Sequence, residues 1–183
     1  MTFDTASLGE QGGFARLGLA PELLQAVAEL GYVEPTAVQA SAIPRALPRQ
    51  DGAFGHADLM VSSQTGSGKT AAFLLPVLHT LLAMQAQEEQ AARVERERLA
   101  AEAAERGEGT PKRPRRKNPA DPRHFKPAVP GALILCPTRE LAQQVAHDAI
   151  DLVRYCKGLR IANVVGGMPY AMQIARLQNA NLV

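Results

Sequence analysis

The residues best suited to chemistry form a short loop between two apolar runs. Its members, in order, are Ser63, Gln64, Thr65, Gly66, Ser67, Gly68, Lys69 and Thr70. The two glycines let the backbone curl until successive N–H groups converge on one point, and such a nest favours a phosphate group. Lys69 can reach the β- and γ-phosphates of a nucleotide, and the Thr70 hydroxyl can ligate a Mg²⁺ ion that bridges them. The loop therefore predicts a nucleoside triphosphate site, with Lys69 and Thr70 as candidate catalytic residues and Thr70 as the metal ligand.

One position departs from the general phosphate-loop pattern G-x-x-x-x-G-K-[ST]. Ser63 stands where that pattern has glycine, so the loop by itself does not decide the function. The alternative is an ordinary Gly/Ser turn in front of a helix.

The loop needs a strand before it and a helix after it. The apolar run Leu59-Met60-Val61 predicts the strand. After Thr70, apolar side chains recur at helical spacing, which predicts a helix in which Pro76 causes at most a kink. These side chains are Phe73, Leu74, Val77, Leu78, Leu81 and Leu82.

Two further helices are predicted before the loop. Pro21 suits a first helical position, and Gly31 is well placed to end that helix. Its apolar face consists of Leu23, Leu24, Val27 and Leu30. The next helix begins after Thr36 and is predicted to end near Ile43-Pro44.

Gln39 has two possible roles. Thr36 and Gln39 have the spacing of a capping box, in which each side chain bonds the backbone N–H of the other residue. Alternatively, the Gln39 amide matches the N6/N7 edge of adenine, as glutamine does in the DNA major groove. Tyr32 would then offer a stacking face for the base. Geometry alone leaves both roles open.

The chain after residue 130 alternates between strand and helix patterns. Residues 132–136, 160–165 and 181–183 predict strands, the first of them a parallel strand covered on both faces. Between them, Thr138 caps a helix that runs towards Tyr155, and residues 169–178 predict another helix after a tight turn at Gly166-Gly167. The first of these helices is expected to bury Leu141, Val145, Ile150 and Leu152.

Arg139 occupies the first turn of its helix, where the helix dipole favours an acid. A cation there indicates a bound anion, with a merely solvated arginine as the alternative.

Composition limits the function classes. The chain has 183 residues, 46% of them hydrophobic and 21% charged, with a net charge of +2. These values predict one soluble domain with a substantial core. Neither a secretion signal nor an 18-residue apolar stretch is present in the sequence, so we expect a cytoplasmic location and no membrane contact. Cys136 and Cys156 lack metal-ligand spacing and are expected to be reduced, partly buried thiols.

Residues 1–13 are expected to form a flexible lead-in, and residues 85–130 a charged, disordered insertion. Within the insertion, residues 85–106 could form a solvated helix through pairs such as Glu89 with Arg93 and Glu102 with Arg106. Residues 107–130 are rich in Pro and basic side chains, which predicts disorder. This basic cluster is either a solubilising linker or an electrostatic patch for nucleic-acid phosphates.

Four stretches together resemble one family. Gly31-Tyr32, Pro35, Thr36 and Gln39, preceded by Phe14, resemble the adenine-reading Q motif. Residues 63–70 resemble motif I, with Ser63 where alanine is usual, Pro137 to Ala142 resemble motif Ia, and Gly166-Gly167 resembles the GG motif. The chain is therefore similar to the amino-terminal part of DEAD-box ATP-dependent RNA helicases.

This resemblance implies a fold and a set of ligands. The fold is an α/β, RecA-like domain of the P-loop NTPase type, with helices on both faces of a parallel sheet that is incomplete at the C-terminus. Residues 1–183 would form part of the first of two such domains. In that fold one further strand lies beside the strand before the glycine loop, and a second further strand lies next to it. ATP and Mg²⁺ would be the cofactors, and RNA, single-stranded or duplex, the partner; the resemblance leaves open whether ribosome or RNA-degradation assemblies are partners too. The nucleotide contacts would be Phe14, Tyr32, Pro35, Thr36, Gln39 and residues 63–70. The RNA backbone contacts would be Pro137, Thr138, Arg139, Gly166 and Gly167.

The expected function is that of the ATP- and RNA-binding portion of a helicase that unwinds or remodels RNA duplexes at full length. The 183 residues contain no Asp-Glu-Ala-Asp stretch, whose acids hold Mg²⁺ and position the attacking water in the family, so they are expected to bind without catalysing. The alternatives are an ATP- and RNA-binding module without hydrolysis and, less favoured, an unrelated small-molecule kinase with a P-loop.

Overall fold

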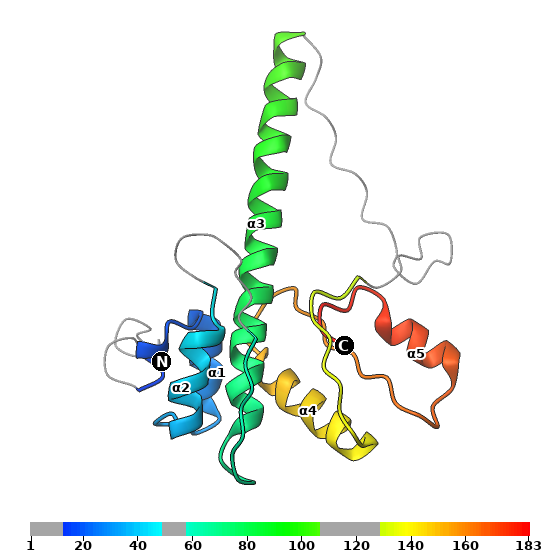
Figure 1. Ribbon diagram of the computed structural model, residues 1–183. Coiled ribbons are helices and arrows are strands. Elements are labelled where there is room, and N and C mark those ends of the chain that lie inside the picture. Colours follow the sequence, from blue (N-terminus) through cyan, green and yellow to red (C-terminus); the bar gives the residue numbers. More distant parts are fainter. Residues whose placement is uncertain (1–12, 49–57, 107–128) are drawn as a thin grey trace, which may run out of the picture.

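The computed structural model describes residues 13–48, 58–106 and 129–183. Their elements are the short 3₁₀ turn η1 (Ala15–Leu17), α1 (Pro21–Glu29), α2 (Ala37–Ala46), α3 (Lys69–Glu105), α4 (Arg139–Leu152) and α5 (Tyr170–Leu177). Figure 1 shows α1 and α2 on one side of the first half of α3, with α4 and α5 towards the other side. The second half of α3 projects beyond the other described elements (Figure 1).

The first half of α3 forms the centre of the core. Leu74, Leu75 and Leu78 are completely buried there. Leu74 and Leu78 belong to the apolar positions that the helical spacing predicted, whereas Phe73, also among them, is 40% exposed. Apolar side chains of α1, α2, α4 and the C-terminal segment pack against these leucines, because burial of aliphatic side chains is the main favourable term in folding. These contributions come from Leu23 and Val27 of α1, Ile43 of α2, Val145, Ala149 and Leu152 of α4, and Leu182.

The predicted start and end of α1 are confirmed. Pro21 is its first residue, where the missing N–H costs nothing. Leu30 caps its C-terminus, and Gly31 follows with φ 79°. That left-handed conformation is strained for other residues, which explains glycine at this position.

Two helix predictions are corrected. α2 continues through Pro44 to Ala46, and its last turn is closed by the Leu47 N–H, which donates to Ile43 O at 3.1 Å. In α4, Leu141 and Ile150 are 37% and 53% exposed, whereas Ala149 is completely buried. Residues 145, 149 and 152 share one helical face, and Ile150 points about 100° away from Ala149.

The expected parallel sheet is present in the described residues only as two isolated parallel bridges, Ala132 with Leu182 and Ile161 with Leu182. Residues 181–183 thus lie between residues 131–134 and 160–162. The backbone bonds include Ile134 N–H to Val183 O (2.8 Å) and Ala162 N–H to Leu182 O (3.0 Å). Residues 59–61, the predicted strand before the glycine loop, make no such bridge and are 43%, 100% and 43% exposed.

The second half of α3 differs from the predicted disorder of residues 85–130. The helix continues to Glu105, so residues 85–106, here called the α3 arm, take the solvated-helix alternative. Residues 107–128 and 1–12 lie outside the described residues.

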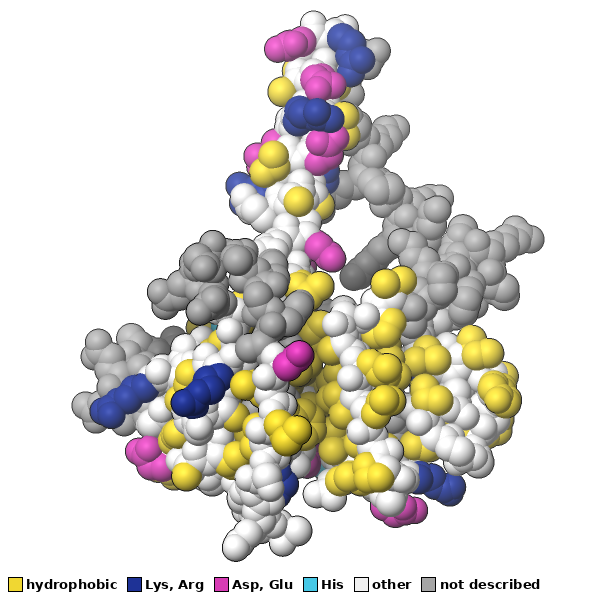
Figure 2. Space-filling model, in the orientation of Figure 1, with side chains coloured by type: hydrophobic (Ala, Val, Ile, Leu, Met, Phe, Trp, Pro, Cys, Tyr) yellow, Lys and Arg dark blue, Asp and Glu magenta, His cyan; other side chains and the backbone are white. Residues whose placement is uncertain are grey.

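Figure 2 shows the charged side chains of the arm along its length. Ion pairs join Arg93 with Glu97 (2.9 Å), Arg98 with Glu95 (2.8 Å) and Glu102, and Arg106 with Glu102 (3.9 Å). The predicted pair of Glu102 and Arg106 is confirmed; Arg93 pairs with Glu97 in place of Glu89.

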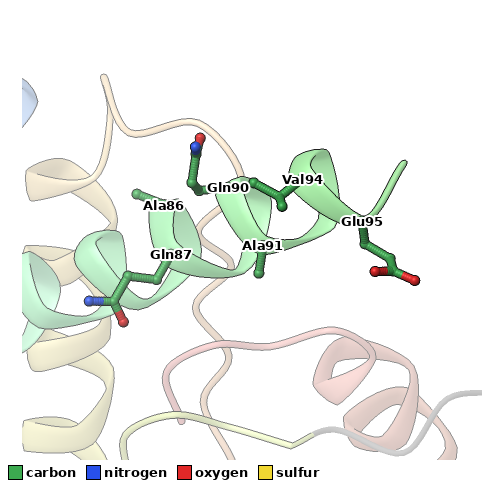
Figure 3. A pocket seen from close by; sticks show the side chains of 6 residues that line it. All are labelled: Ala86, Gln87, Gln90, Ala91, Val94 and Glu95. Carbon is green, nitrogen blue, oxygen red and sulfur yellow. The ribbon is translucent and has the colours of Figure 1, made fainter. Parts of the chain in front are cut away.

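Apolar side chains are sparse on the α3 arm. Figure 3 shows Ala86, Ala91 and Val94 beside the polar Gln87, Gln90 and Glu95 on an open surface. Among the described residues, α3 is also the one helix long and apolar enough to cross a membrane by length and composition. Its apolar half is the core just described, which accounts for that composition.

Candidate nucleotide-binding site

The glycine loop has the curled backbone that the sequence predicted. Gly66 and Gly68 have φ 77° and 82°, in the left-handed region that glycine occupies without strain. Gly68 is the N-cap of α3, and Lys69 begins the helix. The unpaired N–H groups at the start of α3 therefore lie next to the loop, as a phosphate site requires.

Lys69 folds back over the loop that precedes it. Its ammonium donates hydrogen bonds to Ser63 O at 2.6 Å and to Gln64 O. A bound polyphosphate would compete with these two carbonyl oxygens for the same cation. The loop thus already places a positive charge on the side where phosphates would bind.

The capping box at the start of α2 is confirmed. The Thr36 N–H donates to Gln39 Oε1 at 2.9 Å, and the Gln39 N–H donates to Thr36 Oγ1 at 3.4 Å. The two residues are only three apart in the chain, which is why their spacing predicted the contact.

The same two side chains also hold the glycine loop, which sequence reasoning missed. The Thr36 hydroxyl donates to Ser67 O at 2.8 Å, and Gln39 Nε2 donates to Gly68 O at 3.1 Å. Gln39 is only 5% exposed. A Cβ atom on Gly68 would lie 2.4 Å from Gln39 Nε2, far inside van der Waals contact. The predicted nucleotide residues at the starts of α2 and α3 are therefore brought together.

Two aromatic rings of the predicted nucleotide contacts stack on each other. The Phe14 and Tyr32 ring centroids are 6.4 Å apart with an interplanar angle of 26°. Phe14 is 3% exposed and belongs to the core, whereas Tyr32 is 45% exposed. Tyr32 therefore has free ring surface for a base, and Phe14 supports it from the interior. Pro35, between Tyr32 and the capping box, is half-buried.

The residues of the loop fit a nucleotide phosphate better than they fit a protein-bound metal. Gln64, Thr65 and Gly66 are exposed, Ser67 and Thr70 are half-buried, and the Ser67 hydroxyl is shielded without a hydrogen-bond partner. Among the described residues no group of three His, Cys, Asp or Glu side chains could hold a metal ion. A Mg²⁺ ion at Thr70 would therefore be held largely by the phosphates that it accompanies, a common mode for this cation.

A second cluster joins the predicted RNA residues. Arg139, the first residue of α4, donates from Nη1 to Gly166 O at 3.2 Å. Gly167 has φ 83°, and a Cβ atom there would lie 3.1 Å from the same nitrogen. Thr138, preceded by the exposed Pro137, caps α4 by accepting from the Leu141 N–H at 3.2 Å. None of the ion pairs between described residues involves Arg139, so its charge remains available to an anion.

The nucleotide and RNA clusters occupy the same end of the molecule. The glycine loop lies below the start of α3 in Figure 1, and the N-terminus of α4 lies at the same lower edge. Between them runs an open groove of about 850 Å³, lined mainly by apolar residues of α3 and by residues 131–136, with Lys69 and Thr70 also on its wall. Lys69 and Thr70 thus share this groove with Leu141 of the first turn of α4, and no hydrogen bond between described residues joins the two clusters.

Comparisons with known proteins agree on one family. The model of the family "DEAD/DEAH box helicase" matches residues 36–183. The ATP-dependent RNA helicase SrmB of Haemophilus influenzae is 37% identical over 157 residues, which cover 86% of this chain and 25% of that protein.

Two solved structures are similar in fold. A DEAD box protein from Methanococcus jannaschii superposes with a TM-score of 0.59 at 28% identity, over 94% of this chain and 34% of that one. The RNA-helicase Prp28 from Chaetomium thermophilum, bound to ADP, gives a TM-score of 0.55 at 32% identity, over 91% and 30%. The chain thus spans about a quarter of the length of the SrmB relative and about a third of these structures.

Proposed function

The chain belongs to the DEAD/DEAH box helicase family, and we propose that it is the ATP- and RNA-binding portion of an ATP-dependent RNA helicase. The observation that carries this proposal is the junction of Thr36 and Gln39 with the carbonyls of Ser67 and Gly68. It connects a base-recognition segment to a phosphate loop, so one nucleotide could contact both. The similar Prp28 structure was solved with ADP, which supports an adenine nucleotide as the ligand.

Different residues would contact the base and the phosphates of the nucleotide. Gln39 would read the adenine edge, with Tyr32 stacking beside the base and Phe14, Pro35 and Thr36 supporting that segment. Residues 63–68 would surround the phosphates with N–H groups while Lys69 neutralises their charge. Mg²⁺, held through the Thr70 hydroxyl, would supply charge stabilisation at the phosphates.

RNA would bind through its backbone at the second cluster. Arg139 offers guanidinium donors, and Gly166 and Gly167 leave the backbone accessible, since neither carries a side chain. Thr138 and Pro137 position the start of α4. Contacts of this kind carry no sequence information, which suits an enzyme that unwinds or remodels many duplexes. A cytoplasmic location remains a prediction.

The second candidate is an ATP- and RNA-binding module that does not hydrolyse ATP. It applies to residues 1–183 taken alone, because they lack the acids that hold Mg²⁺ and position water in phosphoryl transfer. It would bind both ligands with the same residues.

Binding titrations test the proposal. We expect the full-length gene product to bind Mg²⁺-ADP and single-stranded RNA. Lys69→Ala should weaken ADP binding and change RNA affinity little. Arg139→Ala should weaken RNA binding and change ADP affinity little. An unrelated P-loop kinase would bind ADP and show no RNA affinity, and that result would contradict the proposal.

A further inference from the structure

Tyr170 is the most exposed aromatic side chain among the described residues. It is 84% exposed, compared with 45% for Tyr32 and 40% for Phe73. An aromatic ring of this exposure buries little apolar area and contributes little to folding. Its position in the chain, next to other candidate binding residues, therefore indicates a role in binding.

Tyr170 lies close along the chain to the proposed RNA contact. Tyr170 is the first residue of α5, four positions after Gly166, whose carbonyl accepts from Arg139. Four residues span at most about 14 Å, so Tyr170 lies within reach of nucleotides that neighbour a phosphate at Arg139.

The turn that carries Tyr170 is fixed on both sides. Gln173 Nε2 donates to Met168 O at 2.9 Å from within α5, and Gln173 is only 9% exposed. Arg139 holds Gly166 from α4 at 3.2 Å. The ring is therefore presented on a backbone that needs little further ordering when a ligand binds, which lowers the entropic cost of the contact.

We propose that Tyr170 stacks on a base of the single-stranded RNA whose phosphate is bound by Arg139 and the Gly166-Gly167 turn. This inference rests on the proposed function, because it needs RNA at that cluster. Stacking on an aromatic ring tolerates any base, since every base has a π-face. The contact would add affinity for unpaired bases to a site that otherwise reads only the backbone.

Charge favours RNA over a protein as the occupant. The cation of Arg139 has no acidic partner in the ion pairs of the described residues, and the N-terminus of α5 has no side-chain cap. An anionic backbone would use both features, whereas an apolar protein surface would use neither.

The test compares two RNA probes of equal charge by fluorescence anisotropy. One is a labelled single-stranded oligouridine, and the other has abasic residues at its central positions. The full-length gene product, with Mg²⁺ and a non-hydrolysable ATP analogue, is measured beside Tyr170→Ala, Tyr170→Phe, Tyr170→Leu and Arg139→Ala.

Stacking predicts a specific pattern. Tyr170→Ala should bind oligouridine roughly 5- to 150-fold more weakly, because one base stack is worth about 1–3 kcal/mol, and should bind the abasic probe as the wild type does. Tyr170→Phe should match the wild type, and Tyr170→Leu, which keeps bulk without a π-face, should resemble the alanine variant. Circular dichroism should show all variants folded, since the side chain is exposed.

Other patterns overturn the inference in distinguishable ways. If Arg139→Ala weakens both probes while Tyr170→Ala changes neither, RNA binds at the cluster without stacking, and the Tyr170 face would be a surface for a protein. If Tyr170→Leu equals the wild type, the contact is simple apolar burial. If Arg139→Ala also leaves both probes unchanged, the proposed RNA site itself is wrong.

Discussion

Gly68 and Gln39 make the closest contact between the glycine loop and the helix before it. We expect Gly66→Ala, whose new Cβ meets no atom within 4 Å, to cost only the left-handed strain of about 1–2 kcal/mol. Gly68→Ala has a similar φ but would place Cβ 2.4 Å from Gln39 Nε2, so it should cost more. Urea unfolding of both variants measures the difference.

A double-mutant cycle separates strain from the clash. In a Gln39→Ala background the extra cost of Gly68→Ala should shrink, giving a coupling of roughly 0.5–3 kcal/mol, as for other residues in contact. Strictly additive effects would show that the two residues do not constrain each other.

Gln39 also allows the two roles of its amide to be separated. Replacing Gln39 with Ala removes the Gln39 half of the capping box and the bond to Gly68 O, so we expect a loss of about 1–2 kcal/mol in unfolding free energy. If the amide reads adenine, the same variant should lose its preference for ADP over GDP in calorimetric titrations. Lower stability with unchanged selectivity would leave Gln39 a capping residue alone.

His79 makes the stability depend on pH. The Ala20 N–H donates to His79 Nδ1 at 3.1 Å, and burial lowers the pKa of His79 below its ordinary value of 6.5. The folded state therefore prefers the neutral ring, whose contribution is complete above the unfolded pKa and is lost as the pH falls through the lowered folded pKa. We expect His79→Gln to flatten the decline of unfolding free energy below about pH 6.5. His147→Gln, at an exposed position, is the control. If unfolding free energy falls with pH as steeply in His79→Gln as in the wild type, His79 is not the group responsible.

The two halves of α3 differ in how much their apolar side chains contribute to the stability of the fold. Leu78 is completely buried in the core, whereas Val94 on the arm is 55% exposed. Leu78→Ala should lower the unfolding free energy by about 2–5 kcal/mol, and Val94→Ala should stay within about 0.5 kcal/mol. Thermal melts of the two variants decide this, and equal losses would mean that the arm packs against something in solution.

Local contacts were predictable at the element scale, and distant ones were not. The capping box joins residues three apart, and the start of α1 and its terminating Gly31 depend on single residues. The bonds from Thr36 and Gln39 to the glycine loop cross 31 and 29 residues, so no local pattern indicates them; only the family resemblance placed these segments at one site.

The differences from the predictions have physical reasons. Large apolar side chains become rare after residue 85, which leaves disorder or a solvated helix as the two possibilities for residues 85–106. Ala, Glu and Arg are nevertheless strong helix formers, and ion pairs at i, i+4 support a solvated helix that continues α3. The hydrophobicity of Ile150 predicts a buried side chain. The helical periodicity instead puts Ala149 on the face that contains Val145 and Leu152, and Ile150 points away from it.

At the scale of the whole molecule, apolar surface remains uncovered around the central groove. Leu133, Leu135 and Met60 are 63%, 85% and 100% exposed, and Figure 2 shows hydrophobic side chains gathered over residues 129–136 and α5. In the fold that the family resemblance implies, one further strand lies beside the strand that precedes the glycine loop, and a second further strand lies next to it. The groove separates residues 59–61 from residues 131–136 at the corresponding place.

This exposed apolar surface predicts how residues 1–183 behave in solution when they are expressed alone. Large uncovered apolar patches favour association, so we expect that polypeptide to self-associate or to melt without cooperativity. Light scattering and thermal melts, beside the full-length gene product, provide the comparison. A monomeric 1–183 polypeptide with a sharp transition would contradict this reading of the groove.

The most direct measurement of the central claim is the rate of phosphate release from ATP by the full-length gene product, with and without single-stranded RNA. RNA should raise the rate in the wild type, Arg139→Ala should lose most of that stimulation, and Lys69→Ala should reduce the rate about 100-fold or more, as removal of a group that stabilises transition-state charge does. Turnover that ignores RNA, or that survives Lys69→Ala unchanged, would contradict the assignment of an ATP-dependent RNA helicase.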